Sequence, residues 1–100
     1  MLYFLDILVD AKDLSLDELW DLWEKEADAA AGAKEAGLLV SVYKVVGQRR
    51  VIAIMNAESH DQLDQIIMAG LPMSDYLVIK EITPIRDYAD FTADLKRRWK

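Results

Sequence analysis

Residues 38–58 have the sequence LLVSVYKVVGQRRVIAIMNAE, in which two apolar runs flank a short turn at Gly47 and Gln48. Both runs are rich in β-branched residues, so they predict two strands, residues 38–46 and 49–58, joined as a hairpin. Neither run has a clean polar face, and a strand pair that is apolar on both sides has to be covered on both sides. We therefore expect helices of the same chain to cover one side and a second copy of the chain to cover the other.

The chain before the hairpin predicts one strand and one long helix. Residues 2–10 are mostly apolar on both alternating faces, which is typical of a buried strand. Ser15 and Glu18 have the spacing of a capping box, so a helix is expected to begin there. It is predicted to run to Ala36 and to end at Gly37.

The chain after the hairpin predicts a helix, a strand and a second helix. Ser59 is expected to open the first of these helices, which stops at residues 69–70. Residues 76–83 are expected to form a strand that Pro84 closes. Residues 87–98 have apolar positions at helical spacing, so we expect an amphipathic helix that docks on its own core or on a neighbouring copy.

The predicted order is β-α-β-β-α-β followed by a C-terminal helix, which indicates a ferredoxin-like α+β fold. Right-handed crossovers place the first two helices on one face of a four-stranded antiparallel sheet. The other face is apolar as well, so we expect two copies to pair sheet to sheet in a homodimer or a higher homo-oligomer. Residues 1–85 are predicted to form this domain and residues 86–100 a C-terminal helical extension.

Composition narrows the classes of function. The chain has 100 residues, of which 53 % are hydrophobic and 30 % are charged, as expected of one globular domain. Its net charge of −6 argues against a nucleic-acid partner, and no apolar run is long enough for a membrane span. With no cysteine and a single histidine, thiol chemistry and Cys- or His-rich metal sites are excluded. A cytoplasmic protein is the default expectation.

Glu26 is the main catalytic candidate. It lies at the edge of the apolar stripe of the first predicted helix, and a carboxylate beside two tryptophans, partly out of water, has a raised pKa that suits a general base or acid. The alternative is a glutamate that reaches solvent or pairs with Lys25 or Lys44. The stripe itself consists of Leu16, Leu19, Trp20, Trp23, Ala27, Ala30 and Ala31.

Tyr43 and Lys44 point to opposite faces of their strand, and whichever faces the helices could meet Glu26. A tyrosine hydroxyl or a lysine ammonium can stabilise a developing enolate oxygen. The alternative places Tyr43 in the core and lets Lys44 reach water at an edge. Trp20 and Trp23 either form the wall of a pocket or belong to the core.

Asp6 is a further candidate for substrate binding, because an acid in the middle of an apolar strand needs a partner. Arg49 and Arg50 follow the turn of the hairpin, where their usual role is solubility. The chain has no phosphate-binding glycine loop, no dinucleotide fingerprint, no nucleophile elbow and no metal-ligand spacing. Any catalysis is therefore expected to need no metal and no other cofactor.

Four short segments together resemble the muconolactone isomerase family. They are Met1-Leu2-Tyr3-Phe4, Tyr43-Lys44-Val45-Val46-Gly47, Glu58-Ser59-His60-Asp61-Gln62-Leu63, and Gly70-Leu71-Pro72-Met73 with Tyr76 three residues further on. They occur in the family's order and cover about residues 1–85. The resemblance implies a dimeric α+β barrel, which agrees with the fold expected from the residues.

The resemblance also implies an activity. In this family a base removes a proton conjugated to the carbonyl of an unsaturated lactone, and the proton is returned at the other end of the dienolate, during the breakdown of aromatic compounds. No cofactor is implied. The family's candidate base falls on Glu26, which Lys25 precedes in a basic-acidic run.

The sequence departs from the family pattern in four places, which favours a different substrate. Tyr43 and Lys44 stand where a tryptophan and an arginine are expected, and Met73-Ser74-Asp75 replaces an apolar-proline segment. The first helix carries two additional tryptophans, and the tail is longer. Two alternatives stay open: a cofactor-independent monooxygenase or cyclase of a biosynthetic pathway, and a non-catalytic binding or assembly module.

Overall fold

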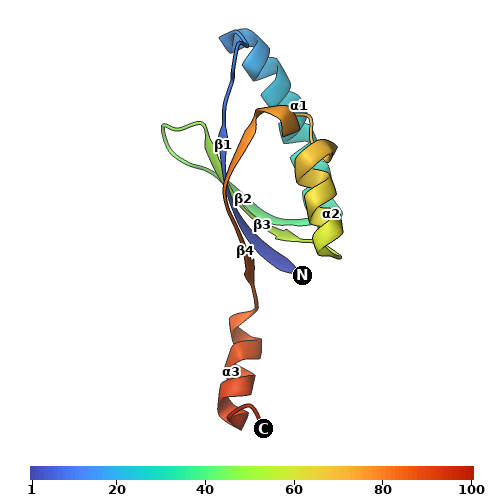
Figure 1. Cartoon of the computed structure of the whole chain (residues 1–100), viewed down its shortest axis with the longest axis vertical. Helices are drawn as coiled ribbons and strands as arrows, with labels where there is room; N and C mark the ends of the chain where they lie inside the picture. The colour runs from blue at the N-terminus through green and yellow to red at the C-terminus, as the bar shows by residue number, and fades with distance from the viewer.

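The computed structural model describes all residues, 1–100, and contains the elements that the sequence predicts (Figure 1). The strands are β1 (Leu2–Val9), β2 (Leu39–Lys44), β3 (Arg50–Asn56) and β4 (Leu77–Ile85). The helices are α1 (Leu16–Glu35), α2 (His60–Gln65) and α3 (Tyr88–Arg97), with a π-helical turn η1 (Ile66–Gly70) and a 3-10 turn η2 (Ser74–Tyr76) between α2 and β4.

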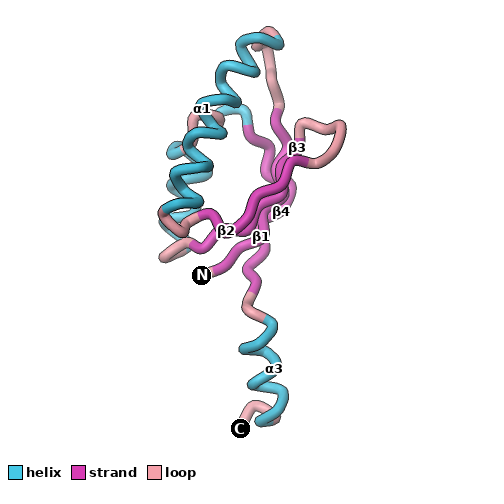
Figure 2. Tube along the Cα trace, turned by 180° about the vertical axis from the view of Figure 1, so that it is seen from behind, coloured by secondary structure: helices cyan, strands magenta, loops and turns pink.

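The four strands form one antiparallel sheet in the order β2-β3-β1-β4. Both α1 and α2 pack on the same face of this sheet, as Figures 1 and 2 show from opposite sides. The ferredoxin-like α+β arrangement is therefore confirmed, and so is the presence of a C-terminal helix.

Local signals set the ends of α1 where the sequence predicts them. The Glu18 backbone N–H donates to Ser15 Oγ at 3.2 Å, and the Ser15 N–H donates to Glu18 Oε1 at 3.0 Å, which completes the capping box. Ala36 caps the other end. Gly37 follows with φ +82°, a left-handed conformation that a residue with a side chain adopts only with strain.

Several predicted boundaries are wrong. β4 does not close at Pro84 but continues to Ile85, with Pro84 opposite Tyr3 of β1. Because β4 is an edge strand, a proline there removes no interior ladder hydrogen bond. The second predicted helix is regular only to Gln65 and continues as the π-helical turn η1, and β2 and β3 are shorter than the predicted strands.

The core lies between the sheet and the two helices. One face of β1 supplies Tyr3, Leu5, Ile7 and Val9, all buried, and β2, β3 and α2 add Leu39, Ala53, Met55 and Leu63. The predicted stripe of α1 is only partly correct, because Leu16, Trp20, Ala27 and Ala31 are exposed. The side of α1 that faces the sheet instead carries Leu19, Leu22, Trp23, Glu26, Ala30 and Ala33.

No helix of this chain covers the second face of the sheet, here called the helix-free face. It carries partly exposed apolar side chains and, among them, Asp6 in an ion pair with Arg50. Arg50 Nε donates to Asp6 Oδ1 at 2.8 Å and Nη2 donates to Oδ2 at 2.5 Å. Asp6 thus has the partner that the sequence demands. Arg50 forms this ion pair, whereas the sequence led us to expect only a role in solubility.

The C-terminal helix α3 does not dock on its own core. It continues in the direction of β4 and projects beyond the sheet (Figures 1 and 2). The radius of gyration is 15.8 Å, against about 13 Å for a compact domain of this length. None of the helices combines the length and the apolar character needed to cross a lipid bilayer.

We expect Leu5→Ala to lower the free energy of unfolding by about 2–5 kcal/mol, because Leu5 is completely buried at the centre of the sheet. Val46→Ala, at the tip of the hairpin where the side chain is 93 % exposed, should change it by no more than about 0.5 kcal/mol. Urea unfolding followed by circular dichroism measures both. A loss of equal size in the two variants would contradict the assignment of this core.

Candidate active site

Glu26 lies on the side of α1 that faces the sheet, next to Trp23. The sequence placed it at the edge of the apolar stripe, but the structure places it inside the buried side. Its carboxylate is half-buried, and Oε2 is enclosed without any hydrogen-bond partner. An unpaired buried carboxylate oxygen is rare because it costs free energy, so this position calls for a role other than stability.

Burial raises the pKa of Glu26 above its ordinary value of 4.5, and the backbone N–H of Met73 offsets part of this rise. The raised pKa follows from the apolar neighbours, which solvate a charge poorly. A carboxylate held in this way is a stronger base than one in water.

Two hollows meet at Glu26 and Trp23, which line both. The larger is an open cleft of about 760 Å³ between α1 and the edge strand β2, here called the cleft. The smaller is a more enclosed cavity of about 270 Å³ between the helices and the sheet, with almost entirely apolar walls. The cleft is lined by Trp20, Trp23, Glu24, Glu26, Ala27, Ala30, Ala31, Lys34, Val42, Lys44 and Val51.

Lys44, and not Tyr43, lies on the face of the sheet that Glu26 faces. In the register of β2 with β3, Lys44 lies opposite Val51 and Val42 lies opposite Ala53, and the side chains of all four point toward the helices. Lys44 Nζ donates a hydrogen bond to the carbonyl oxygen of Val45 at 2.9 Å, and Lys44 makes no ion pair. The ammonium is therefore at the rim of the cleft and free to turn toward a ligand.

Tyr43 and Asp6 lie on the helix-free face. Tyr43 pairs with Ile52 and is 67 % exposed, while Asp6 is held by Arg50. The hydrogen bond from Arg50 keeps the pKa of Asp6 below its ordinary value. Within one copy of the chain, neither residue is brought together with Glu26.

The two tryptophans form one wall of the cleft. The ring centroids of Trp20 and Trp23 are 6.2 Å apart with the planes tilted by 44°, and both side chains line the cleft. Lys25 is exposed and lines neither hollow. The pocket-wall interpretation of the tryptophans thus fits the geometry, whereas Lys25 is not placed at the site by this one chain.

Comparison with known proteins agrees with the fold. The model of the family described as muconolactone delta-isomerase matches residues 1–90. This chain belongs to the muconolactone delta-isomerase family. A crystal structure of muconolactone isomerase is similar in fold, with a TM-score of 0.74 and 20 % sequence identity, over 87 % of this chain and 91 % of that one. A search of curated proteins finds no match.

The sequence reasoning missed two charged residues of the cleft in this family member, Glu24 and Lys34. Lys34 lines the cleft beyond Ala27, Ala30 and Ala31. The signal was its helical spacing from these alanines, which places all four on one side of α1. Lys34 and Lys44 give the cleft two positive charges from different elements.

The remaining polar groups are not at this site. The single histidine, His60, begins α2 and its Nδ1 is hydrogen-bonded with the Tyr3 hydroxyl, and His60 lines neither hollow. No three acidic or histidine side chains lie close enough to hold a metal ion. Of the two acidic side chains that line the cleft, Glu24 is exposed and Glu26 is half-buried, so Glu26 is the candidate for a base in this member of the muconolactone delta-isomerase family.

Replacing Glu26 by glutamine should raise the free energy of unfolding at neutral pH, because it removes a charge that burial disfavours. Below the ordinary pKa of 4.5 the carboxyl is protonated in both the folded and unfolded states, so no penalty exists there. Above the raised pKa of the folded state the penalty is complete. The free energy of unfolding of Glu26→Gln should thus exceed that of the parent chain by a growing amount as the pH rises.

Urea unfolding from acidic to neutral pH measures this difference. Asp28→Asn, on the exposed side of the same helix, is the matched control and should shift the free energy of unfolding by no more than about 0.5 kcal/mol. A Glu26→Gln chain that is less stable than the parent at neutral pH would show that the carboxylate is not disfavoured by burial.

Proposed function

We propose that this protein is an isomerase of the muconolactone isomerase type. It catalyses a cofactor-free proton transfer that shifts a double bond within a small unsaturated lactone, in the breakdown of aromatic compounds. The observation that carries the proposal is the carboxylate of Glu26, half-buried, with one oxygen unpartnered, at the junction of the two hollows. Family membership agrees with it.

Glu26 acts as the base in this mechanism. Its carboxylate removes a proton from the carbon conjugated to the lactone carbonyl, and the electron pair of the C–H bond moves into the conjugated system as a dienolate. The carboxylic acid so formed returns the proton at the other end of the dienolate. The double bond has then moved, Glu26 is again a carboxylate, and no atom has been gained or lost. The apolar walls favour this cycle because they raise the basicity of the carboxylate.

Lys44 stabilises the negative charge that develops on the lactone oxygen. Its ammonium is on the same face as Glu26, and turning it into the cleft costs only its exposed hydrogen bond to the Val45 carbonyl, roughly 0.5–1.5 kcal/mol. Trp20 and Trp23 hold the apolar part of the substrate. Tyr43 and Asp6 have no part in this mechanism within one copy of the chain, because they lie on the other face of the sheet.

The size of the cleft favours a second candidate function. A volume of about 760 Å³ lies in the range that accommodates drug-sized ligands and exceeds what a six-carbon lactone acid needs. A cofactor-independent monooxygenase or cyclase acting on a larger aromatic compound would use the same tryptophan wall. Binding of such compounds, with no turnover of muconolactone, would favour this alternative.

Glu26→Gln should lower the rate of muconolactone isomerisation by about 10²–10⁴-fold, because it removes the base while keeping the shape of the side chain. The reaction is followed by ultraviolet absorbance with the purified chain. In the parent chain the rate should fall as the pH is lowered through the raised pKa of Glu26, since protonation removes the base. Asp28→Asn should retain the parent rate. Full activity of Glu26→Gln would exclude Glu26 from the mechanism.

We also propose that a second copy of the chain covers the helix-free face in a homodimer. The face presents the partly exposed apolar side chains of Leu2, Phe4, Leu8, Ile52 and Ile54 from the two central strands, and apolar side chains exposed together on one face mark an interaction surface.

Ile54→Arg should therefore convert dimers to monomers, because it places a charge in the middle of this face. Sedimentation equilibrium measures the mass, and Val46→Arg at the exposed tip of the hairpin is the control that should leave it unchanged. A parent chain that is monomeric at high concentration would contradict the proposed dimer.

A further inference from the structure

The enclosed cavity between the helices and the sheet, here called the inner cavity, is larger than the gaps in an ordinary core. Its volume is about 270 Å³, whereas voids in protein cores seldom exceed the size of a water molecule. Of its 19 lining residues 17 are hydrophobic, and the other two are Glu26 and Gly70. The proton transfer proposed above uses the carboxylate at its border and leaves the space itself without a role.

The inner cavity exists because small residues stand where a core normally has large ones. In the first half of α1 the positions that face the sheet carry two leucines and a tryptophan. In the second half they carry three alanines, Ala29, Ala30 and Ala33, and none of these is fully buried. On the sheet, Ala53 of β3 adds a fourth alanine to the lining. A leucine at any of these positions would occupy part of the space.

The wall on the side of α2 is irregular. The π-helical turn η1 follows α2 directly, and its Ile66, Ile67 and Gly70 line the inner cavity. Turns of this kind are rare and occur frequently at functional sites. Two separate features, the alanines of α1 and the turn η1, therefore border the same space.

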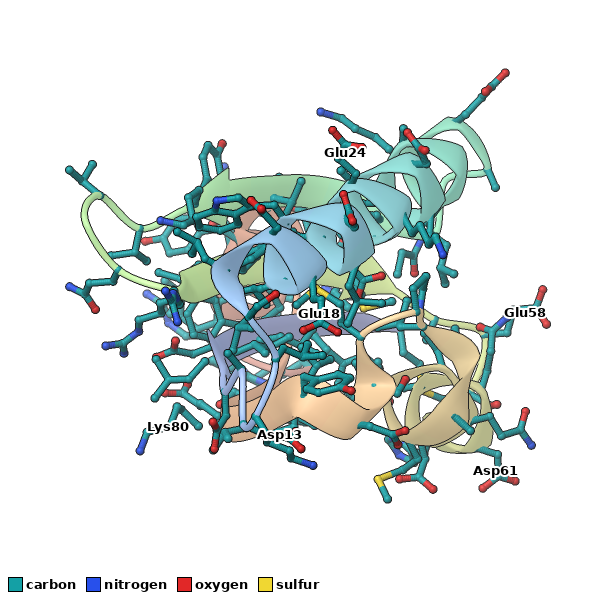
Figure 3. All side chains as sticks on the ribbon, turned by 90° about the horizontal axis from the view of Figure 1, so that it is seen from above. Asp13, Glu18, Glu24, Glu58, Asp61 and Lys80 are labelled. Carbon is teal, nitrogen blue, oxygen red and sulfur yellow. The ribbon has the colours of Figure 1, made fainter.

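Water does not explain the inner cavity. A buried water needs about two to four polar partners, and large apolar cavities stay dry. The only polar side chain in the lining is Glu26, whose Oε2 has no partner within the chain. The acidic side chains of Glu24 on α1 and Asp61 on α2 point away from the space between the two helices (Figure 3). The cavity therefore suits an apolar occupant.

One ligand can extend from the cleft into the inner cavity, because the two hollows share part of their lining. The shared residues are Trp23, Glu26, Ala30, Val42 and Val51. The cleft offers charges of both signs, from Glu24, Lys34 and Lys44. The inner cavity has no basic residue, so an anionic group there would lie beside the Glu26 carboxylate with nothing to neutralise it. The charged part of a ligand thus belongs in the cleft and an apolar part in the cavity.

We propose that the inner cavity binds an apolar substituent of the substrate, an unsaturated lactone with an alkyl or aryl group on the carbon that loses the proton. A cavity of about 150 Å³ accommodates benzene, so about 270 Å³ accommodates a substituent of roughly six to ten carbon atoms. The lactone ring then lies at Glu26, within reach of Lys44. This substrate class rests on the proposed function, whereas the affinity of the cavity for an apolar group does not.

Methionine NMR tests the binding without any reaction. Met55 and Met73 are buried and line the inner cavity, whereas Met1 and Met68 are exposed and line neither hollow. The full chain, labelled with carbon-13 at the methionine methyl groups, is titrated with a saturated γ-pentyl lactone, which has no double bond to move. The signals of Met55 and Met73 should shift and those of Met1 and Met68 should not. Unchanged Met55 and Met73 signals at millimolar lactone would overturn the proposal.

Filling the inner cavity should remove this binding. Ala33 lines the inner cavity and not the cleft, and Ala33→Leu should weaken binding about tenfold or more, since each methylene kept out lowers the affinity about fourfold. Ala33→Val adds less volume and should weaken it less, which keeps the test open if the leucine prevents folding. Ala36→Leu, at the exposed cap of α1 and outside both hollows, should bind like the parent chain. Folded Ala33 variants that bind as tightly as the parent would contradict the assignment.

The parent chain should also prefer substituted lactones as substrates. The kcat/KM of the double-bond shift should rise about three- to fourfold for each methylene added to a γ-alkyl group, from methyl to pentyl. This rise should be lost in Ala33→Leu or reduced in Ala33→Val. Equal kcat/KM along the series, or the same rise in the Ala33 variants, would show that the substituent does not enter the inner cavity.

The outcomes also separate this proposal from the proposed function. Methionine shifts that depend on Ala33, in a protein that isomerises no lactone, keep the apolar subsite and remove the isomerase. Glu26-dependent isomerisation without these shifts and without a preference for longer substituents removes the subsite and keeps the isomerase.

Discussion

The sheet is apolar on both faces, and this chain has enough helix to cover one of them. The inner strand β1 shows this most clearly. The helices α1 and α2 bury one side of it, while Leu2, Phe4 and Leu8 point to the side without helices. The covered face needs a long helix lying across it, and the 20 residues of α1 span about 30 Å. The length of α1 leaves its Trp20 and Ala27 beside the edge strand β2, where the cleft opens.

Glu26 shows how the covering helix combines packing with chemistry. Leu19 and Trp23 bury their side chains on the same side of α1, and a leucine at position 26 would continue this contact without any penalty for burying charge. The glutamate instead leaves Oε2 enclosed and unpartnered. Such a local conflict with stability is expected where a group is kept for proton transfer. The Asp6–Arg50 pair is the contrasting case, since there the buried carboxylate is fully paired and its pKa is lowered.

The overall fold was predictable because its signals are local. The capping box at Ser15, the glycine after α1 and the β-branched runs each act within a few residues. The choice between Tyr43 and Lys44 was not predictable, because it depends on a shift in the β2–β3 register between Leu39 and Ser41. Simple alternation from the buried Leu39 would turn Tyr43 inward, whereas the extra residue in β2 turns Val42 and Lys44 inward.

Two other features could not be predicted either, because they also depend on how distant parts of the chain pack together. The partner of Asp6 lies 44 residues away in the chain, on the neighbouring strand, and a charged residue beside a turn gives no sign of such a role. The rotation of α1 about its axis was misjudged because tryptophan was counted as buried wherever it fitted the stripe. Trp20 lies instead in the open cleft, with Arg49 over its ring at 5.9 Å. The surface that makes the site distinctive therefore depends on tertiary packing.

The two lysines of the cleft bear on what this family member can bind. Lys44 and Lys34 are flexible point charges, whereas an arginine presents a rigid fork that matches both oxygens of a carboxylate. A point charge suits one developing oxygen at least as well, so the stabilisation of a dienolate needs no arginine. Firm recognition of a carboxylate on the substrate does benefit from one. In the proposed mechanism the lysines therefore serve the dienolate oxygen, while the tryptophan wall and the width of the cleft leave room for a lactone larger than a six-carbon acid.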